Sequence, residues 1–360
     1  MKKISLPNIR IGFLDALLAA SLLAVAAWAL QAPPVLVFLL ACVGLIPLAK
    51  QMGAATEVLA ARAGPRVGGL LNATLGNAAE LIITLVAIRE GYIELAKASI
   101  TGSIIGNLLL VLGFSLLAGG IRNGVQRFPH EAAGRYATLL TLAVVALCVP
   151  SVFGQTIGDP MDARVEYLSL GVAGAMILIY ALSLVYSLKD RNGVFTPPRE
   201  ADDAPSRAGG WTAFLRLGLA TAGVVVLSEI LVGAVEPVIH ASGVSEFFLG
   251  IILVPVVGNV AEHFVAVDVA VRNQMELSLE VALGSCLQIA LLVAPLLVFA
   301  SLAMGNPLTL VFNPFEVMAV IAGVGVVALI AVDGRSNWLE GSVLIAVYAI
   351  LAWAFFLFPV

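Results

Sequence analysis

The chain has 360 residues, of which 61% are hydrophobic and 12% are charged. Soluble domains carry about 25% charged residues, so this composition, with a mean hydropathy of +1.04, excludes a soluble protein and indicates an integral membrane protein. The formal net charge of −4 is small, and no basic surface with interleaved aromatic residues indicates a nucleic-acid partner. The composition implies the lipid bilayer as a partner. It is also compatible with a homo-oligomer.

Eleven apolar runs, separated by Gly, Pro or charged residues, have about the length that a helix needs to cross the hydrocarbon layer. They predict an all-α, polytopic membrane protein with eleven transmembrane helices. The first run also has the layout of a signal peptide, but it is longer than the usual apolar segment of one, so we expect a retained helix. The expected spans cover residues 13–30, 35–61, 69–88, 95–118, 133–152, 165–187, 213–236, 245–271, 277–302, 315–332 and 337–358.

The positions of lysine and arginine predict the orientation, because basic residues near span ends are retained in the cytoplasm. With the N-terminus inside, fifteen of the nineteen basic residues fall in cytoplasmic segments. Only Arg89, Lys97 and Arg164 fall on the opposite side. We therefore expect a cytoplasmic N-terminus and an external C-terminus. The three cysteines stand in apolar runs without metal-type spacing and are predicted to be unpaired thiols.

A repeat relates the two halves of the chain. The motif Gly-Asn-x-x-Glu begins at Gly76 and again at Gly258, and the same offset of 182 residues aligns residues 75–113 without a gap. Five spans lie in each half, and an odd number makes the halves cross the membrane in opposite directions. In secondary transporters such inverted repeats place the substrate site near the membrane midplane. Identical pairs include Asn77/Asn259, Glu80/Glu262, Glu94/Glu276, Gly102/Gly284 and Ser103/Ser285.

This repeat predicts the domain organisation. Residues 1–31 form an extra N-terminal transmembrane helix, and residues 32–188 form the first five-helix repeat. Residues 189–212, rich in Pro, Gly and charge, form a cytoplasmic linker. Residues 213–360 form the second five-helix repeat.

The doubled motif predicts a cation site. Asn77 and Glu80 are three residues apart, as are Asn259 and Glu262, so each pair shares one face of a helix. Carboxylates within a membrane usually mark ion or proton pathways, and a set of oxygen ligands suits Ca²⁺. Two carboxylates neutralise one Ca²⁺, and two protons can replace it. The alternative roles are a neutral buried glutamic acid and interhelical hydrogen bonding by the asparagines.

Further polar residues follow each motif and could surround the ion or hold helices together by hydrogen bonds. These are Ser103, Asn107, Ser285 and Gln288.

Three other residues are candidates for proton transfer or access. His263 neighbours Glu262 and could relay protons or be a hydrogen-bonded core histidine. Glu57 and Glu236 lie near opposite membrane surfaces and are candidate vestibule acids, although solvation at the interface explains them as well. Glu229, Asp268 and Glu316 receive no role from the sequence.

The segments GNAAELIITLVAI and GNVAEHFVAVDVAVRNQMELSLEVALGSCLQIALLVAP closely resemble the two signature regions of the calcium/proton exchanger (CAX) family, within the cation/calcium exchanger superfamily. The segments GAATEVLAARAG, GSIIGNLLLVLG and FNPFEVMAV extend the resemblance over most of the chain. It implies ten core helices in two inverted halves after one N-terminal helix. It also implies metal-binding roles for Glu80 and Glu262, with Asn77 and Asn259 adjoining. The linker departs from many relatives, because it is not markedly acidic.

The function expected from these features is antiport of cytoplasmic Ca²⁺ against H⁺, by a transporter without a cofactor in a prokaryotic plasma (inner) membrane. Sodium/calcium exchangers typically carry a Gly-Thr-Ser-x-Pro-Glu motif, which this chain lacks. Exchange of Na⁺ or of another divalent cation is the main alternative. An intramembrane metalloenzyme using Glu262, His263 and Asp268 and a passive channel are the others.

Overall fold

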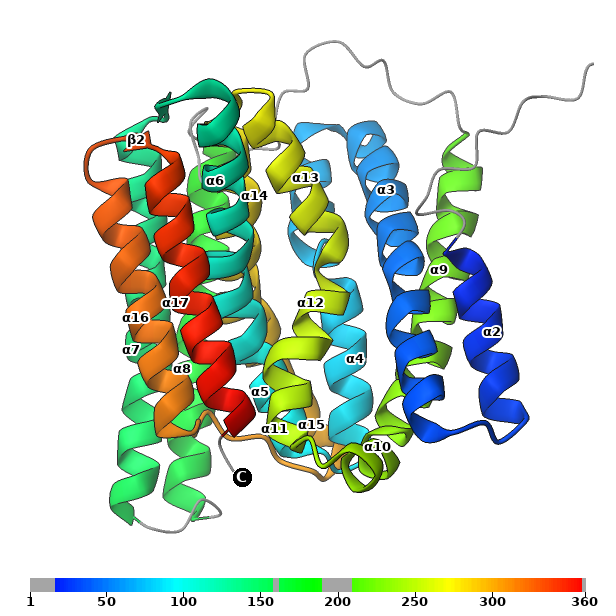
Figure 1. The fold of residues 1–360 in the computed structure, drawn as a ribbon. Helices are drawn as coiled ribbons and strands as arrows, with labels where there is room; N and C mark the ends of the chain where they lie inside the picture. The colour runs from blue at the N-terminus through cyan, green and yellow to red at the C-terminus, as the bar shows by residue number, and fades with distance from the viewer. Residues whose placement is uncertain (1–16, 158–161, 190–208, 358–360) are drawn as a thin grey trace, which may run out of the picture.

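The computed structural model describes residues 17–157, 162–189 and 209–357. The protein is a bundle of helices that run side by side (Figure 1). Its α-helices and π-helices (η) are α2 (Leu18–Ala29), α3 (Pro34–Leu75), α4 (Ala78–Arg89), α5 (Ile93–Ile105), η1 (Gly106–Val111), α6 (Leu112–Asn123), α7 (His130–Ile157), α8 (Ala163–Lys189), α9 (Gly210–Gly233), α10 (Val235–Ser242), α11 (Glu246–Phe248), η2 (Leu249–Leu253), α12 (Val254–Gly258), α13 (Val260–Val271), α14 (Met275–Gln288), η3 (Ile289–Val293), α15 (Ala294–Met304), α16 (Pro314–Ala331) and α17 (Trp338–Leu357).

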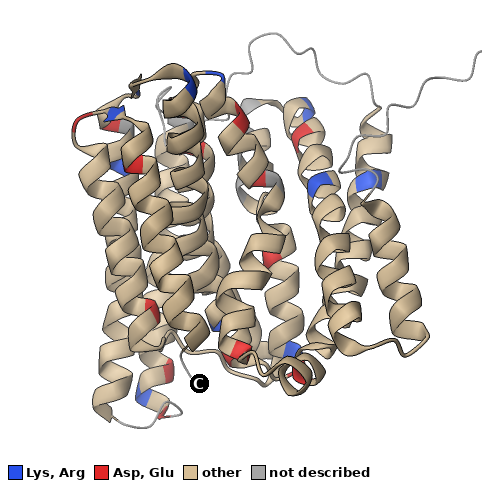
Figure 2. Ribbon diagram, viewed as in Figure 1, with Lys and Arg blue, Asp and Glu red and all other residues tan. Residues whose placement is uncertain are grey.

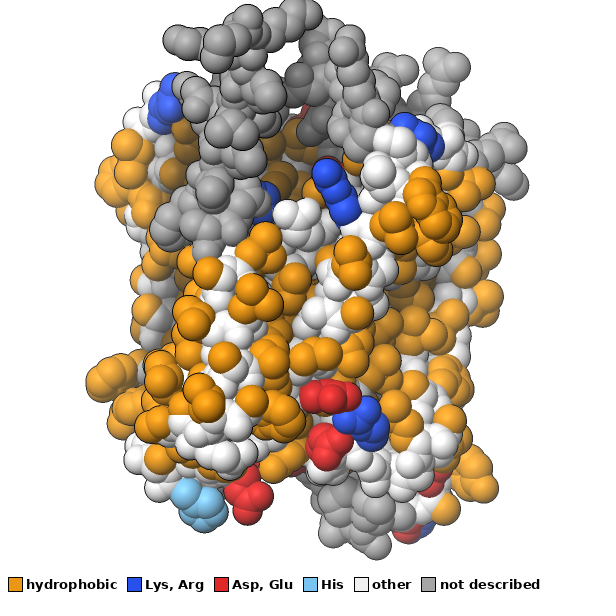
Figure 3. All heavy atoms as spheres, turned by 90° about the vertical axis from the view of Figure 1, so that its right-hand side faces the viewer, with side chains coloured by type: hydrophobic (Ala, Val, Ile, Leu, Met, Phe, Trp, Pro, Cys, Tyr) orange, Lys and Arg blue, Asp and Glu red, His pale blue; other side chains and the backbone are white. Residues whose placement is uncertain are grey.

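Helices at the two edges of the bundle enclose the helices that carry the repeated motif. Helices α2, α3 and α9 pack together at one edge, and α6, α16 and α17 lie at the other (Figure 1). Helices α4, α12 and α13 lie between these edges (Figure 1). The side of the bundle formed by α2 and α9 is largely covered by hydrophobic side chains (Figure 3). Such an apolar side suits contact with lipid, where helices satisfy their own backbone polar groups.

Eight described helices are long and apolar enough to cross a membrane, and a ninth span results if Val235–Ser242 and Glu246–Gly258, bent by 119°, count as one. The protein is therefore an all-helical, polytopic membrane protein. The expected number of eleven spans stays a prediction. Helix α2 has only 12 described residues, and the apolar runs 69–88 and 245–271 are each divided, which leaves α4 and α13 with 12 residues each.

The divisions fall at the two asparagines of the repeated motif. Asn77 (φ −101°, ψ 29°) separates α3 from α4, and Asn259 (φ −94°, ψ 4°) separates α12 from α13. Helix α3 itself reverses at Gly64, whose φ of 83° is outside the range of ordinary helical residues. The chain thus enters the centre of the bundle twice through a broken helix.

The π-helices fall at related positions in the two halves. Residues 107–111 of η1 correspond to η3, residues 289–293, at the offset of 182. A π-turn inserts an extra residue into a helix and often accompanies a functional site. Asn107 lies within η1, and Gln288 directly precedes η3, so both π-helices adjoin the polar residues expected near the site.

Three further features complete the fold. A two-stranded antiparallel ribbon pairs β1 (Gln126–Arg127) with β2 (Arg335–Ser336), which an all-α reading did not predict. The three cysteines are unpaired, as expected, and Cys148 is only half-buried. Lys and Arg side chains are more frequent at the end of the bundle where α13 ends than at the end near α10 (Figure 2).

Candidate functional site

The site is built from the starts of two short helices, one in each half of the chain. Glu80 and Glu262 lie in the first turns of α4 and α13. Glu80 is 7% exposed, and Glu262 is half-buried. The two carboxylates are near enough for electrostatic repulsion between them. The halves therefore bring together the two glutamates that are 182 residues apart in the chain.

A glycine permits this approach. A Cβ atom built on Gly258 would lie 3.1 Å from Oε1 and 3.4 Å from Cγ of Glu80. On the opposite side of the site, a Cβ atom on Gly76 would lie 3.3 Å from Oε1 of Gln288. The glycines of both motifs thus leave room for a polar side chain from another helix.

Asn77 is held by two residues of α14. Its Nδ2 atom donates to Oε1 of Gln288 at 2.6 Å, and its Oδ1 atom accepts from the Ser285 hydroxyl at 2.9 Å. Ser285 in turn accepts from Nδ2 of Asn107 at 3.0 Å and is also within hydrogen-bonding reach of the Glu262 carboxylate. This chain of contacts joins residues from both halves.

Asn259 has the equivalent contact on α5. Its Nδ2 atom donates to the Ser103 hydroxyl at 3.2 Å and to the backbone oxygen of Pro255 at 3.0 Å. Because Ser103 corresponds to Ser285 in the repeat, the Asn77–Ser285 and Asn259–Ser103 contacts join equivalent residues, with the asparagine accepting in the first and donating in the second. The structure therefore gathers both motifs and the four polar residues that follow them into one cluster.

Three oxygen atoms of this cluster are buried without a hydrogen-bond partner among the described residues. They are Oδ1 of Asn107, Oδ1 of Asn259 and Oε2 of Glu262. Buried acceptors without partners are costly, and oxygen atoms of this kind are the ligands that hard cations prefer. Within the described residues no group of three or more His, Cys, Asp or Glu side chains forms a metal cluster. A cation here would therefore depend on amide or hydroxyl oxygens as well as the two carboxylates.

The three access candidates lie outside this network. His263 is half-buried on α13, next to Glu262. Glu57 is exposed on α3, before the reversal at Gly64. Glu236 is exposed on α10, with its Oε1 atom 4.0 Å from Nε2 of His240. Helix α10 lies at the end of the bundle opposite to that reversal (Figure 1).

Two of the acids left without a role are engaged in ion pairs. Asp268 pairs with Arg272 at 2.7 Å, one turn further along α13. Glu229 pairs with Arg89 at 3.2 Å and so connects α9 to the end of α4. Both acids are about half exposed, so neither is part of the cluster around Glu262.

The third such acid, Glu316, makes hydrogen bonds that hold two helices together. Its Oε2 atom accepts from the backbone N–H of Asn313 at 2.8 Å, which completes a capping box at the start of α16. Its Oε1 atom accepts from the Thr101 hydroxyl at 2.5 Å. Glu316 therefore fastens α16 to α5.

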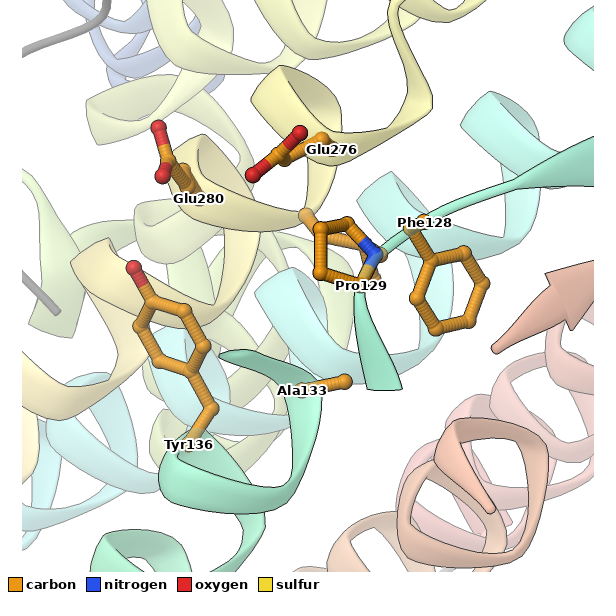
Figure 4. A pocket seen from close by; sticks show the side chains of 7 residues that line it. Phe128, Pro129, Ala133, Tyr136, Glu276 and Glu280 are labelled. Carbon is orange, nitrogen blue, oxygen red and sulfur yellow. The ribbon is translucent and has the colours of Figure 1, made fainter. Parts of the chain in front are cut away.

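A second group of acids lines a small pocket between the starts of α7 and α14 (Figure 4). Glu276 and Glu280 come from α14, and the hydroxyl of Tyr136 points toward Glu280 (Figure 4). Phe128 and Pro129 close the other side. In the sequence Glu276 stands out only as the repeat partner of Glu94, and nothing there indicates this pocket, which contains no residue of the Asn-x-x-Glu motifs.

Comparison with known proteins gives consistent matches. The family described as "Sodium/calcium exchanger protein" matches residues 33–189 and 212–357. The chain is 44% identical over 338 residues to the "Ca(2+)/H(+) antiporter" of Aphanothece halophytica, covering 90% of this chain and 91% of that protein. It is 42% identical over 329 residues to "Ca(2+)/H(+) antiporter ChaA" of Bacillus subtilis, covering 90% and 93%. The solved structure of native YfkE is similar with a TM-score of 0.84 and 39% identity, covering 96% of this chain and all of that one.

Proposed function

Because the chain belongs to the sodium/calcium exchanger protein family, we propose that it is a secondary antiporter that exports cytoplasmic Ca²⁺ in exchange for H⁺. Relatives at 42–44% identity are named Ca²⁺/H⁺ antiporters, and they are transporters rather than enzymes. The bacterial origin of such relatives supports a plasma membrane location. Ca²⁺ and H⁺ are in this proposal the transported ions.

The exchange takes place at Glu80 and Glu262. Metal ligands must be deprotonated, so Ca²⁺ binding to carboxylates releases protons, and protonation releases Ca²⁺. Two carboxylates that repel each other in a poorly hydrated site favour either the doubly charged ion or protons over an empty, charged state. The amide oxygens of Asn77 and Asn259 complete the site. Competition between metal and protons for the same oxygens is what couples the two fluxes.

Alternating access follows from the arrangement of the halves. We propose one N-terminal helix (residues 1–31), two inverted five-helix repeats (residues 32–188 and 213–360) and a cytoplasmic linker (residues 189–212), with the N-terminus inside and the C-terminus outside. The paired helix breaks and the equivalent π-helices support this division. In such transporters the two repeats rock around a fixed central site, and here Glu57 and Glu236 line the inner and outer vestibules.

The single observation that carries the proposal is the pair of glutamates that two broken helices bring together beside unpaired buried oxygens. Sodium/calcium exchange is the second candidate, because the matching family carries that description. The names of the more similar relatives favour proton coupling. The metalloenzyme reading loses support, because Asp268 pairs with Arg272 and does not join Glu262.

The test is Ca²⁺ uptake into vesicles that contain the purified protein. An imposed pH gradient without sodium should drive uptake above the external concentration, and collapse of the gradient with a protonophore should stop it. A requirement for a sodium gradient would replace the proposal with sodium/calcium exchange. Flux that only follows the calcium gradient, without proton movement, would indicate a channel.

A further inference from the structure

We propose that Asn306 and Asn123 are positioning residues that fix the far ends of the two glutamate-bearing helices and thereby set the geometry of Glu80 and Glu262. The inference rests on the exchange function proposed above. It comes from contacts that repeat across the two halves and that lie outside the cation cluster.

Helix α4 ends in a tight turn. Gly91 adopts a φ of +86°, and the N–H of Tyr92 donates back to the carbonyl oxygen of Ala87 at 2.9 Å. This is the pattern of a Schellman motif, which satisfies some of the carbonyls that have no partner at a helix end. The Nδ2 atom of Asn306 donates to the next two carbonyls, those of Ile88 at 2.9 Å and Arg89 at 3.4 Å.

Helix α13 ends in the same way. Asn273, which corresponds to Gly91 at the offset of 182, has a φ of +64°. The N–H of Gln274 donates back to the carbonyl oxygen of Val269 at 2.9 Å. Asparagine tolerates this left-handed conformation better than most residues with a side chain.

A second asparagine meets this end. The Nδ2 atom of Asn123 lies 3.3 Å from the carbonyl oxygen of Ala270 and 3.1 Å from that of Val271, and these carbonyls correspond to those of Ile88 and Arg89. The Nε2 atom of Gln126 also donates to Ala270, at 2.8 Å. Among the described residues, the end of α13 therefore has two side-chain donors, while the end of α4 has one.

Each asparagine belongs to the half that does not contain the helix it holds. Asn306 follows α15 in the second half and holds α4 of the first, and Asn123 ends α6 in the first half and holds α13 of the second. The ends of α4 and α13 lie at opposite ends of the bundle (Figure 1). One clamp is thus available at each membrane surface.

Both glutamates depend on these ends for their position. Helices α4 and α13 have 12 residues each and start at a break, so they have no continuous helix behind them. Ile88 follows Glu80 by eight residues, and Ala270 follows Glu262 by the same number, which places each clamp about 12 Å along the axis from its carboxylate. A tilt at the clamp therefore moves the carboxylate, and metal sites lose function when their ligands shift by about 1 Å.

The segments that carry the clamps are themselves well anchored. Gln126 lies opposite Ser336 in the two-stranded ribbon. The loop after Asn306 is fixed by buried serine hydroxyls that accept from its backbone N–H groups: Ser301 from Leu308 at 2.8 Å, Ser169 from Leu310 at 3.0 Å and Ser151 from Phe312 at 3.0 Å. A clamp on a rigid support can hold a helix end in place.

The substitution Asn306→Asp tests the proposal, because it keeps the shape of the side chain and replaces the donating NH₂ group by an oxygen that the helix carbonyls repel. Asn123→Asp makes the same change at the other surface, at an exposed position. The matched controls are Asn313→Ala and Asn337→Ala. These asparagines cap α16 and α17 at the same two surfaces, and these helices do not carry either glutamate.

The measurement is the apparent Ca²⁺ affinity and the maximal rate of pH-driven uptake, with elution profile and thermal unfolding for every variant. We expect Asn306→Asp to lower the apparent affinity about three- to tenfold, as loss of one or two hydrogen bonds predicts, with a smaller effect on the maximal rate. Asn123→Asp should lower it less, because Gln126 still holds Ala270. Both controls should keep the wild-type affinity even where they lower the unfolding temperature.

Wild-type affinity in both aspartate variants would overturn the proposal, as would equal losses of affinity in the controls. If Asn306→Asp does not fold, the comparison of Asn123→Asp with Asn337→Ala decides in the same way. Absence of pH-driven uptake by the wild-type protein would instead refute the proposed function. The two failures are therefore distinguishable.

Discussion

Replacement of Gly102 by alanine should disturb the site without touching any of its polar groups. Gly102 lies in α5, where it packs against the backbone of Ile251 in η2 and the ring of Pro255 in α12. A Cβ atom at this position would clash most closely with the carbonyl oxygen of Ile251, and it would lie 2.6 Å from Cγ of Pro255 and 2.7 Å from the carbonyl carbon of Ile251. Ordinary contacts begin at 3.4 Å, so the two segments would have to separate by at least about 0.7 Å.

This separation is large compared with the tolerance of the neighbouring contact. Ser103 follows Gly102 directly and accepts from Nδ2 of Asn259 at 3.2 Å. An added 0.7 Å would stretch this contact to about 3.9 Å, beyond the range of a hydrogen bond. Overpacking of this kind costs about 1–3 kcal/mol, against a gain of at most about 1 kcal/mol from replacing glycine in a helix. We expect lower thermal stability together with weaker Ca²⁺ binding.

The repeat provides the matched control, because Gly284 is the equivalent of Gly102. A Cβ atom on Gly284 would have no neighbour within 4 Å, so Gly284→Ala should keep or raise the unfolding temperature. Thermal unfolding of the purified variants and Ca²⁺ titration of pH-driven uptake measure both effects. The reasoning is refuted if Gly102→Ala matches the wild type in both measurements, or if the two alanine variants lose stability equally.

Three further predictions concern the site and its access. Glu80→Gln and Glu262→Gln should each abolish exchange in folded protein, because one remaining carboxylate leaves the charge of the divalent ion unbalanced in a poorly solvated site. Alanine in place of Asn77 or Asn259 should weaken uptake less, since water can replace a neutral ligand. A variant of either glutamate that exchanges at the wild-type rate would contradict this mechanism. Cysteines at Glu57 and Glu236, in a background without the native cysteines, should react with an impermeant maleimide from opposite membrane sides, and reaction of both from one side would overturn the topology. Lower pH should weaken equilibrium Ca²⁺ binding, because protons compete for the carboxylates. The affinity should depend less steeply on pH in Glu80→Gln than in the wild type. An equal dependence on pH in both proteins would argue against proton release from Glu80.

The sequence predicted the parts of this structure that depend on local pattern. Hydropathy located the apolar helices, and the spacing of Asn77, Glu80 and their repeat partners located the residues that the fold brings together. The run 69–88 nevertheless does not form one helix, because hydropathy does not register the break at Asn77. The 119° bend between α10 and the following helical segment falls at residues 243–245, between two expected spans, where the Gly-Val-Ser sequence indicates a turn but not its direction.

The contacts between helices could not be predicted from the local sequence pattern. Asn123 ends α6 and Asn306 follows α15, and the partners of both are backbone carbonyls that any sequence would supply. At the offset of 182, Asn306 corresponds to Gly124, which is the neighbour of Asn123. The similar positions of the two asparagines in the repeat were the only sign of them in the sequence. The ion pair of Asp268 with Arg272 was predictable, because the two residues are four apart on one helix.

The position of each glutamate in the first turn of a short helix has a consequence for the release of the ion. The N-terminal end of a helix carries about half a positive charge, and the ends of α4 and α13 both begin at the asparagines of the site. Helices α3 and α12 end at the same two breaks, so carbonyl groups with the opposite partial charge lie there as well. Each break therefore presents N–H groups, which stabilise ionised carboxylates, beside carbonyl oxygens, which attract a cation. A carrier must unload its ion on the far side of the membrane, and N–H groups near the carboxylates lower the cost of leaving them ionised when the ion departs.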